Sequence, residues 1–299
     1  MNLGYCCINL SLKDQGISTN RSMIKKTFQE RGKNYAGQLA LLNLKDLYAI
    51  LKWNDSHNIK VYRMSSDIFP WMSEYSFEDL DNFDEISLLL HEIGQTIIQS
   101  GHRVGFHPGQ FNVLPSPNKD IVKKTVYDLN QHAKIMDLMG LPKSHMFPIN
   151  IHVGASYGDK KKALNSFCSN FELLEESAKL RLVVENDDKP SQYGVQDLYD
   201  GITKVIGCPI TFDHFHHTFC TNGLSSRDAA ELAASTWNGI TPLQHFSSSK
   251  AAYEDSSVID RSHADYIYDP IPSYGLDVHV ELEAKAKDLA LFKYLNDFI

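Results

Sequence analysis

Histidines and carboxylates recur in this sequence at the ends of short apolar runs. Imidazole and carboxylate groups can bind metal ions and transfer protons, so each run offers one candidate for chemistry. The candidates in chain order are His107 in GFHPGQF, His152 in NIHVG, Glu185 in LVVENDD, Asp213 with His214, His216 and His217 in FDHFHH, His245 in LQHFS, His263 in RSHADY, and Glu281 or Glu283 in VELEAK. A single histidine of this kind is more often structural than a ligand. Their shared position at run ends indicates one common site.

The types of donor favour a cluster of divalent cations. Nitrogen and oxygen donors without thiolates suit Mn²⁺, Zn²⁺, Fe²⁺ or Co²⁺ better than Ca²⁺ or a structural zinc ion. Because the potential ligands exceed the needs of one ion, we expect two or three ions. Carboxylates gathered without cations would repel one another and lose hydration. Clustered ions stabilise the attacking and leaving oxygens of an in-line displacement, so phosphodiester hydrolysis is the predicted chemistry.

The elements that must position these residues follow an α/β pattern. Short β-rich runs alternate with stretches of helical periodicity, which is typical of a parallel sheet with crossover helices. The predicted strands lie near residues 2–8, 59–65, 103–107, 147–153, 180–185, 210–213, 241–246 and 276–283. A helix is predicted over 84–100, with Gly101 as its stop, and another over 284–298. Eight such units predict a single domain, residues 1–299, folded as a (β/α)₈ TIM barrel.

The barrel prediction explains why the candidates stand at run ends. In TIM barrels the active site lies at the carboxyl ends of the strands, where side chains from all strands converge. His107, His152, Glu185, Asp213 and His245 each close a predicted strand. We therefore expect them to share one cavity.

Composition indicates what kind of protein carries this site. An apolar content of 42% over 299 residues supports a full core and argues against disorder. The five cysteines are scattered and contain no CxxC pair, which argues against a disulfide framework or a thiolate zinc site. With no targeting segment and no apolar run of ~20 residues, we expect a soluble cytoplasmic protein without a membrane partner, acting as a monomer.

The charge distribution is uneven. The net charge of −8 argues against a nucleic-acid partner, because domains that bind phosphates are usually basic. Residues 13–33, however, carry six basic residues against two acidic ones, a local charge of +4. Part of the negative charge also belongs to the carboxylates expected to surround cations. The net charge therefore does not rule out a polyanion as partner.

The ordered motifs resemble those of the UV damage endonucleases, relatives of endonuclease IV among the xylose-isomerase-like barrels. The resemblance covers nearly the whole chain. The motifs are GYCCIN (4–9), NLKDL (43–47), LKWN (51–54), YRMSSDIFP (62–70), HPGQF (107–111), IHVG (151–154), VENDD (184–188), FDHFHH (212–217), HFSS (245–248), RSHADY (261–266) and EAKAKD (283–288).

The resemblance implies a ligand set and catalytic residues. One metal would be surrounded by Glu185, Asp213, His245 and Glu283, and Glu185 would bridge to a second metal held by His107 and His152. A third would be served by His216 and His263. Among these, the resemblance makes Glu185, Glu283 and His245 the catalytic residues. The expected metal is Mn²⁺, with Zn²⁺, Mg²⁺ or Co²⁺ as alternatives.

The resemblance also implies how damaged double-stranded DNA is recognised. Gln110 and Phe111 would probe the gap left by a damaged dinucleotide pushed out of the helix, with Tyr5 and Asn9 nearby. An aromatic ring can stack on exposed bases, and an amide can bond to orphaned base edges. Barrel-mouth packing is the alternative role for Phe111 and Tyr5. We further expect Arg63, Lys13 and the basic 21–33 segment to neutralise flanking phosphates, unless that segment is plain solvated surface.

The chain departs from the family pattern at two positions that bear on the metals. Leu243 stands where the pattern has a lysine that is carboxylated to serve as a ligand, and leucine has no donor atom. Glu74 stands where a histidine is usual, and we expect it to act as a replacement ligand. Phe111 is a milder change from tyrosine. These departures make the outer ligands the least regular part of the predicted site.

Three functions are compatible with these residues and motifs. The first is an endonuclease that nicks DNA 5′ to cyclobutane dimers and 6-4 photoproducts, and also abasic sites, by attack of a metal-bound hydroxide. The second is a metal-dependent sugar isomerase or epimerase, which explains the ligands but not the HPGQF tip. The third is a lesion-binding protein that no longer cuts, an alternative that Glu185 and Glu283 disfavour because a pure binder would not require them.

Overall fold

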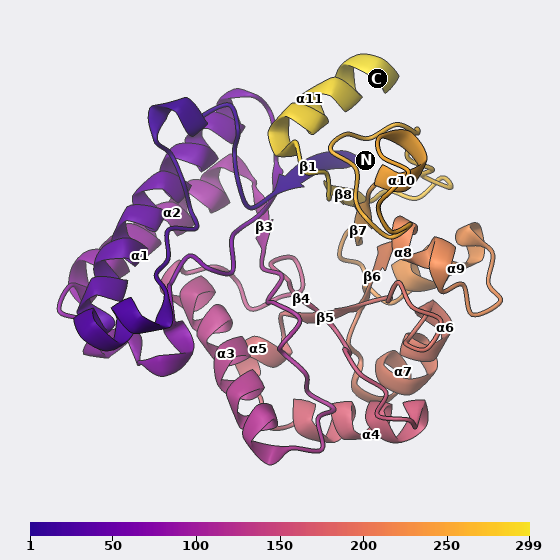
Figure 1. The fold of residues 1–299 in the computed structure, drawn as a ribbon, viewed down its shortest axis with the longest axis horizontal. Helices are drawn as coiled ribbons and strands as arrows, with labels where there is room; N and C mark the ends of the chain where they lie inside the picture. The colour runs from indigo at the N-terminus through magenta and orange to yellow at the C-terminus, as the bar shows by residue number, and fades with distance from the viewer.

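Eight parallel strands surround a central axis in the computed structural model, which describes residues 1–299 (Figure 1). The strands are β1 (Asn2–Cys6), β2 (Val61–Arg63), β3 (Arg103–Gly105), β4 (Ile149–His152), β5 (Leu182–Glu185), β6 (Ile210–Asp213), β7 (Leu243–Phe246) and β8 (His279–Leu282). Their order in the sheet is β3-β2-β1-β8-β7-β6-β5-β4. A parallel bridge between Phe106 and Ile149 brings the two end strands together. The result is a nearly closed barrel, which confirms the predicted fold class.

Helices lie between the strands and cover the outside of the barrel (Figure 1). The longer ones are α1 (Lys25–Ser56), α2 (Phe83–Ser100), α3 (Lys119–Leu138), α4 (Lys160–Phe171), α9 (Ser226–Ser235) and α11 (Lys287–Phe298). The short ones are α5 (Glu176–Lys179), α6 (Val195–Leu198), α7 (Lys204–Ile206), α8 (His214–Phe219) and α10 (Lys250–Tyr253), with single turns at η1 (Lys13–Gln15), η2 (Met72–Glu74), η3 (Phe77–Asp79) and η4 (Tyr199–Thr203). None of the helices combines the length and the hydrophobicity needed to cross a membrane.

The predicted boundaries agree closely with the structure for one helix and less closely for the other. Helix α2 begins one residue before the predicted 84–100 segment and ends at Ser100, where Gly101 takes the left-handed conformation with φ of 65°. Helix α11 begins at Lys287 instead of residue 284. The amides of Lys285 and Ala286 bond to the carbonyls of Ala264 and Asp265, so this segment is tied to a neighbouring loop before the helix starts.

Strand alternation divides the barrel interior into a base that is apolar apart from Arg103 and a polar mouth. Side chains two residues apart share one face of a strand, so Val183 lies below Glu185 and Leu243 lies below His245. Val183 and Leu243 pack with Val61 and Trp237 in a small buried apolar cluster. Leu243 thus closes the space beneath the predicted site and brings no donor atom to it.

A histidine outside this interior makes the stability of the fold depend on pH. His102, between α2 and β3, is 3% exposed. Its burial and the charge of Lys60 lower its pKa to about 4, although Asp55 acts in the opposite direction. The pKa of a histidine in the unfolded chain is ~6.5. Between this pH and about 4, the unfolded chain therefore binds a proton that the folded protein does not bind, and stability is lost as pH falls through this window.

We therefore expect the unfolding free energy to contain a His102 contribution that is about 1 to 2 kcal/mol smaller at pH 5 than at pH 7. Urea denaturation of the wild type and of His102→Gln at both pH values measures it. The variant should lose less stability on acidification. An identical loss in both proteins would show that His102 does not carry this effect.

Candidate metal centre

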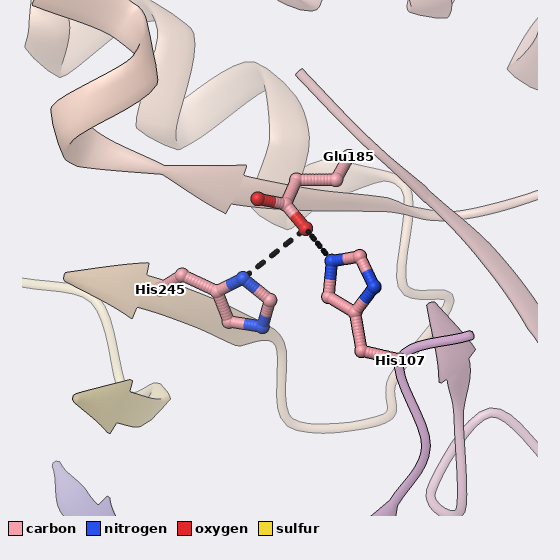
Figure 2. Close-up of side chains that lie close together, drawn as sticks. All are labelled: His107, Glu185 and His245. Carbon is pink, nitrogen blue, oxygen red and sulfur yellow. Dashed lines mark hydrogen bonds and ion pairs between the residues drawn. The ribbon is translucent and has the colours of Figure 1, made fainter. Parts of the chain in front are cut away.

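The carboxylate of Glu185, the last residue of β5, lies among four imidazole rings. On one oxygen, Oε2, His107 Nε2 lies at 3.0 Å and His245 Nδ1 at 3.2 Å (Figure 2). On the other, Oε1, His216 Nδ1 lies at 3.2 Å and His152 Nε2 at 3.8 Å. Glu185 is fully buried. Strands far apart in the sequence therefore converge on one carboxylate.

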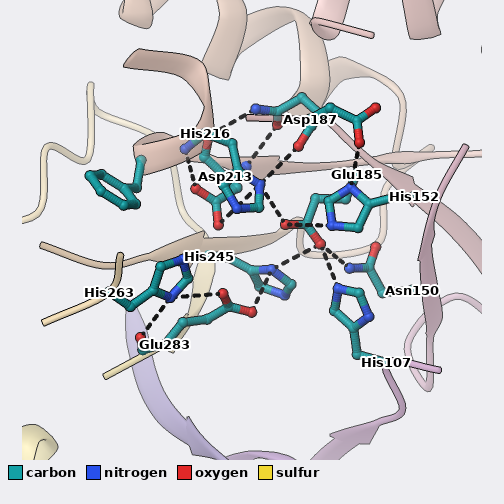
Figure 3. A network of polar contacts seen from close by, with 12 residues as sticks. His107, Asn150, His152, Glu185, Asp187, Asp213, His216, His245, His263 and Glu283 are labelled. Atoms are coloured by element: carbon teal, nitrogen blue, oxygen red, sulfur yellow. Dashed lines mark hydrogen bonds and ion pairs between the residues drawn. The ribbon is translucent and has the colours of Figure 1, made fainter. Parts of the chain in front are cut away.

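Two further carboxylates approach the same histidines from β6 and from the end of β8. Glu283 Oε1 lies 3.4 Å from His245 Nδ1. Asp213 caps α8 by accepting a bond from the amide of His216 with Oδ1, which leaves Oδ2 directed to the interior. Figure 3 shows these residues together at the mouth of the barrel.

Three groups of side chains place their donor atoms close enough to hold an ion. In each group the donor atoms lie within 4.8 Å of one another. The groups are His107, Glu185 and His245; His152, Glu185 and His216; and Asp213, His245 and Glu283. Glu185 and His245 each belong to two groups, so the three positions are contiguous.

Buried donor atoms without partners support this assignment. Glu185 Oε1, Asp213 Oδ2 and both ring nitrogens of His245 are buried and make no hydrogen bond of good geometry. Burying such atoms unpaired costs free energy, and native structures seldom leave them so. A divalent cation would satisfy carboxylate oxygens and imidazole lone pairs together. The residues present therefore fit metal ions.

The electrostatics of the cluster agree with this donor set. Burial opposes ionisation of Glu185, yet the charges of His245 and His152 hold its pKa well below the usual range. Burial also opposes the charged form of His152, but Glu185 and Asp187 outweigh it and raise the pKa of His152 to about 8. The Glu185 carboxylate thus stays ionised, and charge on the imidazoles takes the place that a cation would fill.

The structure brings together seven of the nine residues predicted as metal ligands. These seven are the members of the three groups. His263 lies beside them, with Nδ1 3.5 Å from Glu283 Oε2, but it belongs to none of the groups. His216 joins His152 and Glu185 instead of forming a separate position with His263.

Glu74 lies apart from the three groups, and its role as a replacement ligand stays a prediction. Its side chain is exposed on η2 and belongs to none of the three groups. The neighbours Met72 and Tyr75 are buried, and Tyr75 bonds through its hydroxyl to the Pro70 carbonyl. This turn therefore packs those two residues inward and presents Glu74 to solvent.

Three of the residues predicted to contact DNA have internal partners in this structure. Tyr5 is fully buried; its hydroxyl donates to Asn54 Oδ1 at 2.7 Å and accepts from Asn9 Nδ2 at 2.8 Å. Asn9 is 1% exposed. Arg63 is held inside the barrel, where its Nη1 lies 2.5 Å from Glu283 Oε1. Each of these side chains thus has an internal partner, and its contact with DNA stays a prediction.

The tip after β3 is exposed to solvent. Phe111 is 84% exposed and Gln110 is exposed beside it. A cavity of about 450 Å³ extends from this tip to the cluster. Its lining includes Gln110, His152, Asp187, Lys189 and His216. The tip and the proposed ligands thus border one continuous hollow.

Sequence reasoning missed two residues that contact the cluster. Asn150 donates a hydrogen bond to Glu185 Oε2, and Asp187 Oδ1 lies 3.2 Å from His152 Nδ1. Asn150 stands two residues before His152 on the same strand face, so alternation could have placed it in the barrel interior. Asp187 follows Glu185 in the VENDD motif, but nothing in the sequence indicates that it meets a histidine of another strand.

Comparisons with known proteins decide the family. A sequence model described as UV-endonuclease UvdE matches residues 1–299. The chain belongs to this family. The UV DNA damage endonuclease of Clostridium perfringens is 31% identical over 305 residues, which cover 99% of this chain and 70% of that protein. The crystal structure of SacUVDE is 30% identical in sequence and superposes with a TM-score of 0.85, over 100% of both chains.

More distant structures share the fold alone. Endonuclease IV from Thermus thermophilus is 11% identical with a TM-score of 0.57, over 99% of this chain and 98% of that one. D-psicose 3-epimerase from Clostridium cellulolyticum is 12% identical with a TM-score of 0.56, over 94% and 84%. The barrel therefore does not separate a nuclease from a sugar epimerase, whereas membership of the UvdE family does. The chain is an enzyme of the endonuclease class.

Proposed function

We propose that this UvdE-family protein is a metal-dependent DNA repair endonuclease that nicks double-stranded DNA immediately 5′ to UV photoproducts. The proposed substrates are cyclobutane dimers and 6-4 photoproducts, with abasic sites as a secondary substrate. The observation that carries the proposal is the carboxylate of Glu185, shared by two histidine groups at the barrel mouth. The completeness of these groups argues against a protein that binds lesions without cutting.

The three groups around Glu185 and His245 would hold two or three divalent ions, with Mn²⁺ as the first choice. Ions bound there would neutralise charge developing on the phosphate and lower the pKa of water. Among the protein's own residues, Glu185 supplies one oxygen to each of two groups. Arg63 fixes the Glu283 carboxylate at 2.5 Å, and Asp187 orients the His152 ring at 3.2 Å. His263, 25% exposed, stands at the rim beside Glu283.

The exposed tip supplies the contact with the lesion. Phe111 offers a whole aromatic face to a base, and Gln110 offers donors and acceptors to unpaired base edges. The cavity between the tip and His152 gives a displaced nucleotide a path toward the cluster. The basic 13–33 segment remains a predicted phosphate contact, although Arg21 within it already pairs with Asp46 at 2.6 Å.

Replacing Phe111 with alanine tests the role of the tip. Loss of one base–aromatic stack, about 1 to 3 kcal/mol, should raise the Kd for lesion-containing duplex by roughly 5- to 150-fold. Fluorescence anisotropy with a single-lesion duplex measures it. Mn²⁺ affinity should stay the same, because Phe111 lies outside the three groups. Leu173→Ala, which removes another exposed apolar side chain, is the control. Equal losses in both variants would remove the specific role of Phe111.

The proposed function is tested by nicking of supercoiled plasmid. UV-irradiated and untreated plasmids are incubated with the protein in Mn²⁺, Mg²⁺ or chelator. We expect relaxed circles from irradiated plasmid in Mn²⁺ and little cutting of untreated plasmid. Equal cutting of both substrates would contradict lesion recognition. No cutting with any divalent ion would contradict the endonuclease itself.

A further inference from the structure

A buried carboxylate outside the three ligand groups contacts His245 on the opposite side of its ring. Nδ1 of His245 faces the cluster, at 3.2 Å from Glu185 Oε2 and 3.4 Å from Glu283 Oε1. Nε2 of the same ring lies 3.2 Å from Oε2 of Glu281. The β7–β8 register pairs His245 directly with Glu281. The imidazole therefore lies between the proposed ligands and a further carboxylate.

Glu281 has few other partners in the barrel. It is 2% exposed, and its Oε2 makes no hydrogen bond of good geometry. Arg63 Nη1 is 3.7 Å away and is shared with Glu283, to which it is closer. The interior layer below holds Leu243 with its apolar neighbours and the buried guanidinium of Arg103, which lies over the Trp237 ring. A buried carboxylate oxygen without a hydrogen bond costs free energy, so the place of Glu281 beside His245 points to a role there.

We propose that Glu281 is a positioning residue that fixes the tautomer and ring orientation of His245. A neutral histidine binds a metal through its unprotonated nitrogen and carries its proton on the other one. An Nε2 proton shared with Glu281 would leave the Nδ1 lone pair facing Glu185 and Glu283. Arg63, which contacts Glu281 and Glu283, offsets part of the negative charge. This inference rests on the proposed metal centre.

The first test measures Mn²⁺ binding without DNA, by calorimetry, in Glu281→Leu and Glu281→Gln. Leucine removes the acceptor, and we expect affinity at the positions shared by His245 to fall about 10- to 100-fold. Glutamine keeps an acceptor oxygen and should restore affinity to within a few-fold of the wild type. Thr211→Val is the matched control, because Thr211 is buried in β6 and its hydroxyl has no partner. It should bind Mn²⁺ as the wild type does.

The second test reads the tautomer of His245 directly. ¹⁵N-histidine NMR of the Zn²⁺-loaded wild type should show the His245 proton on Nε2, with the signal assigned by its loss in His245→Gln. A proton on Nδ1 would overturn the inference even if Glu281→Leu failed to fold.

The two proposals fail in different ways. Wild-type Mn²⁺ affinity in Glu281→Leu would overturn the positioning role and leave the metal centre standing. Absence of Mn²⁺ binding in the wild type would overturn the metal centre itself.

Discussion

Replacing Glu185 with glutamine is expected to slow nicking of UV-irradiated DNA by roughly a thousandfold, a size seen when a single electrostatic contact at the reacting centre is lost. Glutamine keeps the shape of the side chain but removes the charge that two ligand groups share. Both oxygens of Glu185 contact histidines of these groups. The rate is measured in single turnover with saturating Mn²⁺.

The control for this variant is Glu231→Gln, which makes the same chemical change on the exposed side of α9. It should nick at the wild-type rate. Circular dichroism establishes that both variants are folded. If Glu185→Gln cut as fast as Glu231→Gln, the assignment of Glu185 as the shared ligand would be wrong.

Removal of divalent cations is the second change with a large expected effect. Dialysis against chelator should reduce nicking at least about a hundredfold, because the cluster then lacks the charge that stabilises the reacting phosphate. Activity should return when Mn²⁺ is added in excess of the chelator. Full activity after exhaustive chelation would contradict metal dependence.

Metal removal should also lower thermal stability, since an ion that binds only the folded state stabilises it. At a free concentration a hundred times the Kd, one ion contributes about 2.7 kcal/mol. Differential scanning calorimetry with and without Mn²⁺ measures this contribution. Glu185→Gln should show a much smaller increase in Tm on Mn²⁺ addition, which separates specific binding from a general salt effect.

The fold and the centre of the site were predictable because both follow from periodicity. Alternating β-rich and helical segments predict parallel strands, and the carboxyl ends of parallel barrel strands must meet. His107, His152, Glu185, Asp213 and His245 therefore converge once the eight strands exist. The loss of a donor at Leu243 was also readable from the sequence, and the structure shows that an apolar layer occupies this position.

The outer part of the site was not predictable, because it depends on which partner each side chain finds. Tyr5 and Asn9 bond to each other, and Tyr5 also bonds to Asn54, a residue of α1. Arg63 meets Glu283 from the other end of the chain. Glu281 and Glu283 look equivalent in the sequence, yet only the register of β8 against β7 shows that they reach different nitrogens of His245.

The central claim is that the side chains around Glu185 form a multinuclear metal centre, and anomalous diffraction tests it most directly. Crystals soaked in MnCl₂ should give two or three manganese peaks, each bonded to residues of one group, with Glu185 bridging two of them. The Glu185→Gln crystals should lose those two peaks. A map in which the wild-type barrel mouth contains no manganese peak would contradict the account.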